Sequence, residues 1–189
     1  MKLTGVIFAA TVSAAPSKFE SENFITSEEV TWRTANDNVM GGSSLGTIEH
    51  FGEYIHFTGQ LDLIDGGFAG FNGQIGSKLT GYDGKTKFLK KRKITGNLVL
   101  RVSARTPTPE RTFKVGILRD TGGTWYHKLA LEQEFKSFEI DFDDFYFSYH
   151  GIPGDLPPPL GSQVRQVRIN ISDEKPEPFE ADINIIQGV

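Results

Sequence analysis

The fold of this chain is decided by a pattern that begins at residue 45 and runs Leu45-Gly46-Thr47-Ile48-Glu49-His50-Phe51-Gly52-Glu53-Tyr54-Ile55-His56-Phe57-Thr58-Gly59-Gln60-Leu61. Residues 45–50 and 54–61 contain β-branched and aromatic side chains, which favour extended backbone. Phe51-Gly52 lies between the two runs and supplies a turn signal. This pattern predicts a β-hairpin.

Further short runs of the same kind follow, rich in Phe, Ile, Val and Tyr and separated by Gly, Pro, Asn and Asp. Several alternate apolar and polar residues with a period of two, whereas helical periodicity is nearly absent. Eight or more such strands predict an all-β fold, an antiparallel β-sandwich of two packed sheets. The expected strands lie at residues 98–104, 113–117, 125–131, 138–142, 167–171 and 183–186.

The composition fits one globular domain. The chain has 189 residues, of which 38% are hydrophobic, and its formal net charge is −4. This charge disfavours general binding to nucleic acid, for which no role is expected. The absence of cysteine excludes disulfides, thiolate catalysis and the common structural zinc sites. No segment after the N-terminal region is apolar enough to span a membrane.

The N-terminus has the pattern of a secretory signal peptide. Lys2 precedes an apolar run that ends at Ala10, and Val12 and Ala14 have the small-x-small relation that a signal peptidase recognises. We therefore expect a signal peptide over residues 1–14, a single β-sandwich domain over residues 15–189, and an exported or organellar location. The alternative is that Val6 and its apolar neighbours form a first β-strand.

Three stretches interrupt the strand pattern. Glycines are frequent from Gly59 to Gly84, which predicts long loops around a short strand at residues 68–71. The stretch from Lys85 to Lys93 carries six basic residues and no acidic one, which is typical of a solvated loop and leaves binding of an acidic partner open. Residues 148–161 contain four prolines, which predicts an extended connection without a strand.

The most distinctive motif precedes the hairpin and runs Trp32-Arg33-Thr34-Ala35-Asn36-Asp37-Asn38-Val39-Met40-Gly41-Gly42-Ser43-Ser44-Leu45-Gly46. Asn36 and Asp37 are residues that bond to nearby backbone, and the glycine pair permits a positive φ or close approach of another segment. We therefore expect a turn that Trp32, Asp37 and Met40 hold in place.

This motif resembles the signature W-x-x-x-N-D-x-V-M-G-G-x-S-x-G of the complex I intermediate-associated protein 30 family. A second block, F-x-G-x-L followed by G-G-F-A, is similar to Phe57 to Leu61 and to Gly66-Gly67-Phe68-Ala69. The resemblance implies a galactose-binding-like jelly roll without enzymatic activity. Because the mitochondrial member is an assembly chaperone, a mitochondrial or other organellar location is the alternative to export.

The resemblance also defines the candidate binding residues. We expect the loop from Asn36 to Ser44 and the segment from Gly66 to Gly70 to form one surface feature, with the glycines admitting a partner backbone. The candidate residues of the motif are Trp32, Asn36, Asp37, Val39, Met40, Gly41, Gly42, Ser43, Gly66, Gly67 and Phe68.

Signals for enzymatic chemistry are weak. The four histidines have no zinc-hydrolase spacing, and neither a nucleophile elbow nor a nucleotide-binding loop is present, so we expect no catalytic residues, metal site or cofactor. His50 and His56 are expected on solvated strand faces. Asp141, Asp143 and Asp144 alternate with phenylalanines, which favours acids in water and aromatics in the core over a carboxylate pair for catalysis. The jelly-roll resemblance leaves a structural calcium site as a side hypothesis.

The sequence therefore predicts a non-enzymatic binding module whose partner is another protein or protein complex, as an assembly factor, chaperone or accessory subunit. Most aromatic residues are expected in the core, but exposed rings at Trp125, Tyr146 and Tyr149 are candidates for a binding face. Because such rings also stack on sugars, a carbohydrate-binding module of the jelly-roll type is the alternative.

Overall fold

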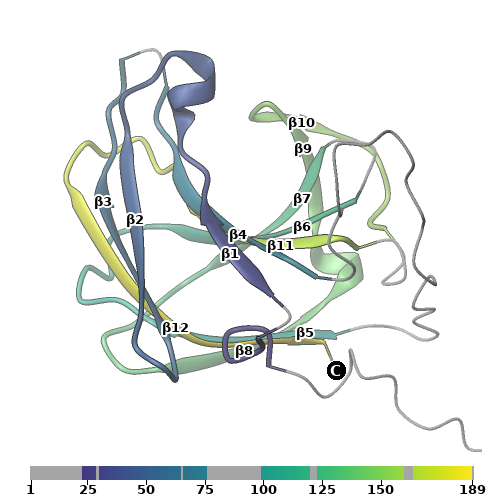
Figure 1. Ribbon diagram of the computed structural model, residues 1–189. Helices are drawn as coiled ribbons and strands as arrows, with labels where there is room; N and C mark the ends of the chain where they lie inside the picture. Colours follow the sequence, from purple (N-terminus) through teal and green to yellow (C-terminus); the bar gives the residue numbers. More distant parts are fainter. Residues whose placement is uncertain are drawn as a thin grey trace, which may run out of the picture.

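The computed structural model describes residues 23–28, 30–64, 66–75, 99–119, 123–159 and 164–188. Two antiparallel sheets pack face to face in this part of the chain (Figure 1). The proposed signal peptide and the basic stretch from Lys85 to Lys93 lie outside the described residues. Among the described residues, no helix is long and apolar enough to cross a bilayer.

One sheet has seven strands and the other has five. The seven-stranded sheet has the order β1 (Thr31–Thr34), β4 (Ala69–Gln74), β11 (Gln166–Ile171), β6 (Phe113–Leu118), β7 (Thr124–Leu129), β9 (Tyr146–Tyr149) and β10 (Ile152–Gly154). The five-stranded sheet has the order β2 (Leu45–His50), β3 (Ile55–Gln60), β12 (Pro178–Gly188), β5 (Val99–Arg105) and β8 (Lys136–Asp141). Two short 3-10 turns, η2 (Asp37–Met40) and η3 (Phe142–Asp144), join strands.

The core between the sheets is built on interlocking phenylalanines. Phe57 of β3 meets Phe71 of β4 at a ring-centroid distance of 5.1 Å and Phe179 of β12 at 4.9 Å. Phe113 of β6 lies 6.3 Å from Phe179. All four side chains are at most 2% exposed. These rings come from both sheets, so burial of their apolar surface holds the two layers together.

The structure confirms the predicted sandwich and the predicted hairpin, which lies at one edge of the five-stranded sheet. Strands β2 and β3 pair antiparallel around a turn in which the Phe51 amide donates to the Tyr54 carbonyl at 3.0 Å and Gly52 has φ +75°. The strands expected later in the chain are also present, within a few residues of the expected bounds. The acids of residues 141–144 are exposed while Phe145 is buried, as the alternation indicated.

Two predictions about local structure are wrong. Residues 148–161 are not strand-free, because β9 extends to Tyr149 and β10 pairs with it through a two-residue turn. His150 and Gly151 in that turn have φ of 50° and 81°, the backbone of a tight hairpin turn. Pro153 is tolerated because β10 is an edge strand and one missing donor costs little there. Trp125 is not an exposed ring either: it is fully buried, and its Nε1 donates to the Leu156 carbonyl at 3.1 Å.

Candidate functional site

The buried carboxylate of Asp37 joins the two halves of the motif. Asp37 opens η2 and has no exposed surface. Its Oδ1 accepts a hydrogen bond from the Ser44 amide at 2.9 Å, and its Oδ2 accepts one from the Ser44 hydroxyl at 2.6 Å. Oδ2 also accepts from the amides of Gly67 at 2.7 Å and Phe68 at 3.3 Å. One side chain therefore ties the loop after β1 to the loop before β4.

These hydrogen bonds keep Asp37 ionised. Burial by itself would raise the pKa of the carboxyl group, because it disfavours the charged form. The bonds from Ser44, Gly67 and Phe68 act in the opposite direction and bring the pKa of Asp37 below its ordinary value. Asp37 is thus a buried anion stabilised by N–H and O–H donors, an arrangement that suits a structural role. We call Asp37 and its donors Ser44, Gly67 and Phe68 the Asp37 cluster.

Two motif glycines are required by this carboxylate. A Cβ on Gly42 would lie 2.4 Å from Cγ of Asp37, and one on Gly66 would lie 2.2 Å from Oδ2. Gly41 differs, since it has space around it but a φ of +92° at the end of η2. In the structure, Gly42 and Gly66 therefore make room for the Asp37 side chain.

Other motif residues surround the Asp37 cluster. The Asn36 side chain donates to the Gly46 carbonyl at 3.1 Å, which joins η2 to the start of β2. Ser43 is exposed and lines a hollow with Leu45 and Leu63. Met40 is 53% exposed at the end of η2. Val39 belongs to η2, but its side chain lies outside the described part of the structure.

Trp32 lies apart from the Asp37 cluster. It lies on β1, half-buried, and its indole packs where a side chain on Gly73 would stand. Its Nε1 donates to the Phe24 carbonyl at 3.3 Å, and its ring lies 5.4 Å from Phe71 in an edge-to-face arrangement. Trp32 therefore packs on β4, while Asp37 makes the hydrogen bonds that fix the turn.

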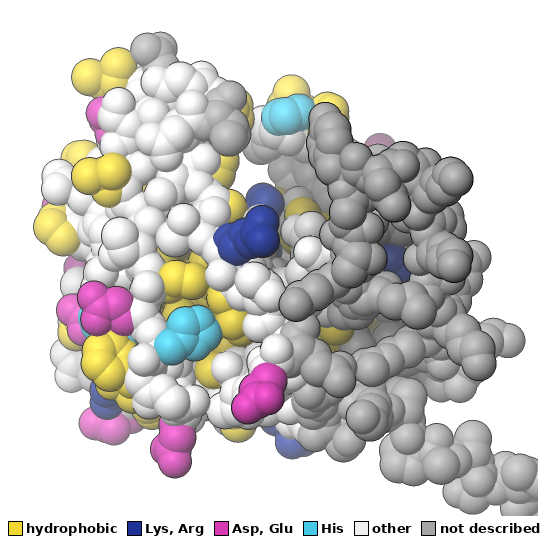
Figure 2. Space-filling model, viewed as in Figure 1, with side chains coloured by type: hydrophobic (Ala, Val, Ile, Leu, Met, Phe, Trp, Pro, Cys, Tyr) yellow, Lys and Arg dark blue, Asp and Glu magenta, His cyan; other side chains and the backbone are white. Residues whose placement is uncertain are grey.

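The loops joined by Asp37 carry exposed apolar side chains, which we call the apolar tip. The tip consists of Met40, Leu45, Leu63 and Ile64, which are 53%, 65%, 43% and 74% exposed. In Figure 2, hydrophobic side chains lie on the surface of the lobe that contains η2 and the ends of β2 and β3 in Figure 1. Aliphatic side chains on rigid loops can be buried against a partner at little conformational cost.

A second surface, of which sequence reasoning had identified only Tyr146, is the outer face of the seven-stranded sheet. Cross-strand register places one row of residues side by side across six strands: Arg33, Asn72, Arg168, Gly116, Tyr126 and Tyr146. On β4, β11 and β6, the neighbours of these residues along the strand are buried. The alternation of β11, in which Gln166, Arg168 and Asn170 interrupt three buried aliphatic residues, was the signal that could have revealed it.

Side chains of this row contact one another. The Arg168 Nε donates to Oδ1 of Asn72 at 2.6 Å, and its Nη1 lies 3.3 Å from the Tyr126 hydroxyl. Tyr126 and Tyr146 are neighbours with a centroid distance of 6.2 Å. Burial raises the pKa of Tyr146, as does its neighbour Tyr126, so the Tyr146 phenol is neutral at physiological pH.

Another group of titratable side chains lies on the outer face of the five-stranded sheet. Asp182 accepts from Arg105 at 2.8 Å and lies 2.7 Å from Nδ1 of His56. His56 is thus half-buried and partnered, contrary to the expected solvated position, whereas His50 is exposed. Asp182 raises the pKa of Arg105. Within the described ranges, no group of three or more His, Asp or Glu side chains is placed to hold a metal.

The fold defines a class, the antiparallel jelly-roll β-sandwich. The family model for complex I intermediate-associated protein 30 matches residues 17–183. The chain therefore belongs to this family, as its motif indicated. Among curated proteins, none matches it significantly.

Solved structures with the same fold include carbohydrate-binding modules. The family 11 module of the cellulosomal cellulase Lic26A-Cel5E of Clostridium thermocellum matches with a TM-score of 0.55 and 14% identity, over 94% of this chain and 96% of that one. The Clostridium thermocellum family 11 module in complex with a β-1,3-1,4-mixed-linked tetrasaccharide has a TM-score of 0.55 and 12% identity, over 93% and 97%. The agarase AgWH50C matches with a TM-score of 0.55 and 8% identity, over 90% of this chain but 26% of the agarase. At these identities the likeness concerns the fold.

Proposed function

We propose that this protein is a non-enzymatic binding module that docks onto another protein as an assembly factor, chaperone or accessory subunit. The observation that carries the proposal is the rigid support of the apolar tip. Asp37 holds both loops in place, while Leu45 and Ile64 remain 65% and 74% exposed beside it. Exposed apolar patches rimmed by polar residues mark sites of protein–protein interaction. The family's description, a protein associated with an intermediate of complex I, supports a protein partner.

Affinity purification from the native source, followed by mass spectrometry, tests this proposal. We expect Ile64→Ser combined with Met40→Ser to abolish capture of the main partner without changing the melting temperature. Ile152→Ser is the matched control, because Ile152 is 70% exposed on β10, outside the motif. Equal capture by both variants would show that the apolar tip is not the docking surface.

A second candidate function, carbohydrate binding, is favoured by a different observation. The row from Arg33 to Tyr146 places hydrogen-bonding groups beside two tyrosine rings on one open sheet face. Sugars need both features, because hydroxyl groups require polar partners and the C–H faces of the rings pack on aromatics. The shared fold with carbohydrate-binding modules is compatible with this function. Glycan binding that competes with free sugar and leaves protein capture unchanged would support carbohydrate binding at a surface separate from the apolar tip.

The location follows from the N-terminal sequence. We propose that residues 1–14 direct the protein to an exported or organellar compartment and are then removed. The intact mass of the protein from its native source should lack these residues. A mature chain that retains Met1 would contradict the proposal.

A further inference from the structure

The outer face of the seven-stranded sheet has a charge opposite to that of the whole chain. Its outward strand positions carry four cations, Arg33, Lys114, Lys128 and Arg168, and no described outward position carries Asp or Glu. The chain as a whole has a net charge of −4. Such a local concentration of positive charge favours an anionic ligand.

Two of these cations are poorly compensated. The ammonium of Lys114 donates to the Ser172 hydroxyl at 2.7 Å, and burial together with the neighbouring Lys128 lowers the pKa of Lys114, while Asp173 and Glu174 act against this shift. Lys128 is exposed on β7, directly opposite Lys114 of β6 in the register. An anion between the two ammonium groups would relieve their repulsion.

Arg168 is held ready for a planar anion. Asn72 and Tyr126 occupy its Nε and Nη1, which orients the guanidinium before any ligand arrives. Within the described part of the chain, no hydrogen bond is made by its Nη2. A preoriented guanidinium binds carboxylate or sulfate with less loss of side-chain entropy than a free one.

Tyr126 and Tyr146 add an apolar platform beside the cations. Gly116 has no side chain, and a Cβ there would lie 3.0 Å from the Tyr126 ring, so the ring lies close over the sheet. Tyr146, on the neighbouring strand, is 38% exposed. Inorganic anions have no use for such rings, whereas the C–H face of a pyranose packs on them.

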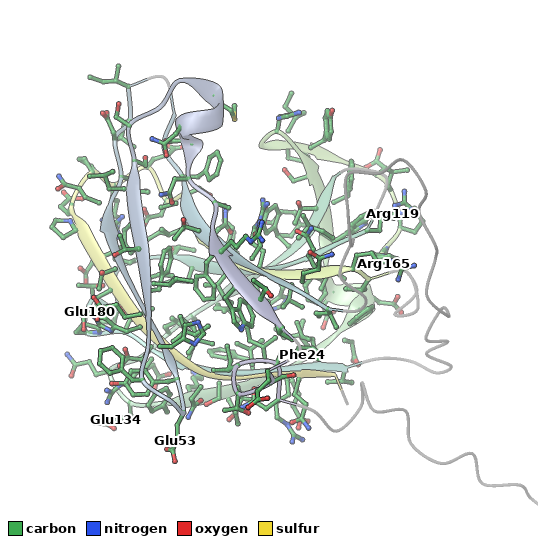
Figure 3. The ribbon with its side chains drawn as sticks, viewed as in Figure 1. Phe24, Glu53, Arg119, Glu134, Arg165 and Glu180 are labelled. Carbon is green, nitrogen blue, oxygen red and sulfur yellow. The ribbon has the colours of Figure 1, made fainter. Side chains whose placement is uncertain are left out.

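The surface also has the length for an oligomer. The row crosses six strands, and at about 4.8 Å between neighbouring strands it extends over about 24 Å. Figure 2 shows Lys and Arg side chains on the floor of a hollow, and in Figure 1 the η2 turn and the β9–β10 hairpin rise on either side of the central strands. Figure 3 shows side chains in the region between the η2 turn and the β9–β10 hairpin. A single sugar would occupy a small part of the row.

We propose that this face binds an acidic oligosaccharide, a chain of pyranose rings that carries carboxylate or sulfate groups. The inference rests on the second proposed function and names its ligand class. Arg168, Lys114 and Lys128 contact the acidic groups, and Tyr126 and Tyr146 pack against the rings. In the row, Asn72 lies between Arg33 and Arg168, and the two tyrosines follow beyond Gly116. This combination fits a ligand with both anionic and hydroxyl groups.

Isothermal titration calorimetry with four defined probes tests the proposal on the full chain. The probes are an oligogalacturonate, a sulfated heparin-type hexasaccharide, neutral cellohexaose and a hexaglutamate peptide. We expect one of the two acidic oligosaccharides to bind at least tenfold more tightly than cellohexaose and hexaglutamate, and the identity of that probe distinguishes carboxylate from sulfate. Affinity should fall as salt is raised, since exposed charges are screened.

Variants locate the site. Tyr126→Ala and Arg168→Gln should each weaken binding at least tenfold, and Lys128→Ala about threefold; because Lys128 is exposed, the last change should leave folding intact. Arg101→Gln is the matched control, since Arg101 pairs with Glu139 on the other sheet. Tighter binding of cellohexaose would overturn the acidic class while keeping carbohydrate binding. Equal binding of hexaglutamate would show an acidic-peptide surface instead, and binding of none of the probes would overturn both the inference and the carbohydrate function.

Discussion

Gly66 packs against the Asp37 carboxylate so closely that no side chain fits at position 66. A Cβ on Gly66 would stand 2.2 Å from Oδ2 of Asp37, which is far inside van der Waals contact. The same oxygen accepts a hydrogen bond from the amide of Gly67, the next residue. The two sequence blocks that identify the family are therefore two sides of one buried contact.

This relationship predicts that Gly66→Ala destabilises the protein through Asp37. We expect a loss of about 2 kcal/mol in the free energy of unfolding, because the new methyl group must displace the carboxylate or the loop. Urea denaturation measures it. In an Asp37→Ala background, the clash with the carboxylate is absent and the penalty of Gly66→Ala should fall to less than half. An unchanged penalty would mean that the glycine is needed for another reason.

The charge of Asp37 makes stability depend on pH. Hydrogen bonds bring the pKa of its carboxyl group in the folded state below the ordinary value of about 3.9, so the stabilisation is complete above that value and is lost as pH falls through the lower, folded pKa. Asp37→Asn should therefore cost about 3 kcal/mol at pH 7, and the difference from wild type should shrink at pH 3 and below.

Urea denaturation of Asp37→Asn at several pH values measures this effect. Asp143→Asn is the control, because Asp143 is exposed in η3 and its replacement should change little at any pH. A constant difference between wild type and Asp37→Asn from pH 7 to pH 2.5 would contradict the role of the charge.

Arg111 is a second buried charged residue whose replacement should cost as much stability as that of Asp37, or more. Its side chain is 1% exposed, pairs with Asp173 at 3.0 Å, and donates to the carbonyls of Lys175 and Glu177. Arg111→Ala should cost about 3–5 kcal/mol, since it removes the cation that pairs with the buried Asp173 carboxylate and leaves two carbonyls without their donor. Arg101→Ala removes an exposed pair and should cost at most about 1 kcal/mol. Thermal and urea unfolding measure both losses. A similar loss of stability in Arg111→Ala and Arg101→Ala would contradict this prediction.

Much of the fold could be predicted because its signal is local. The β2–β3 hairpin and the strand alternation of β6 and β11 follow from period-two patterning, which depends on neighbouring residues. Edge strands were harder. β10 has three residues, one of them proline, and its pairing depends on a turn at His150-Gly151 whose first residue rarely adopts a positive φ.

The candidate site was predictable in its residues but not in their roles. The motif drew attention to Asp37 and the glycines, yet nothing local shows that Asp37 bonds to Gly67 and Phe68 from the other loop. The row that ends at Tyr126 and Tyr146 depends on the order of six strands in the sheet. That order is not sequential, and it could not be predicted from the sequence. Trp125 was misplaced for the same reason, because burial at the centre of a sheet is a property of the whole topology.

Trp125 provides the last prediction, which concerns the segment that contains β10. The indole Nε1 donates a hydrogen bond to the Leu156 carbonyl at 3.1 Å, and the ring packs on Phe147 of β9 at a centroid distance of 5.0 Å. Trp125→Phe keeps most of the packing but removes this donor, so global stability should fall by only about 1 kcal/mol. Local opening of residues 150–159 should become easier, because β10 has a partner on one side alone.

Limited proteolysis with mass spectrometry measures that opening as faster cleavage within residues 150–159 of Trp125→Phe. Trp32→Phe is the matched control, since it also loses an indole donor, to the Phe24 carbonyl, but at the other end of the sheet. It should leave cleavage at residues 150–159 unchanged. If both variants are cleaved there equally fast, the Leu156 bond is not what holds the segment, and the pairing of β9 with β10 must carry that role by itself.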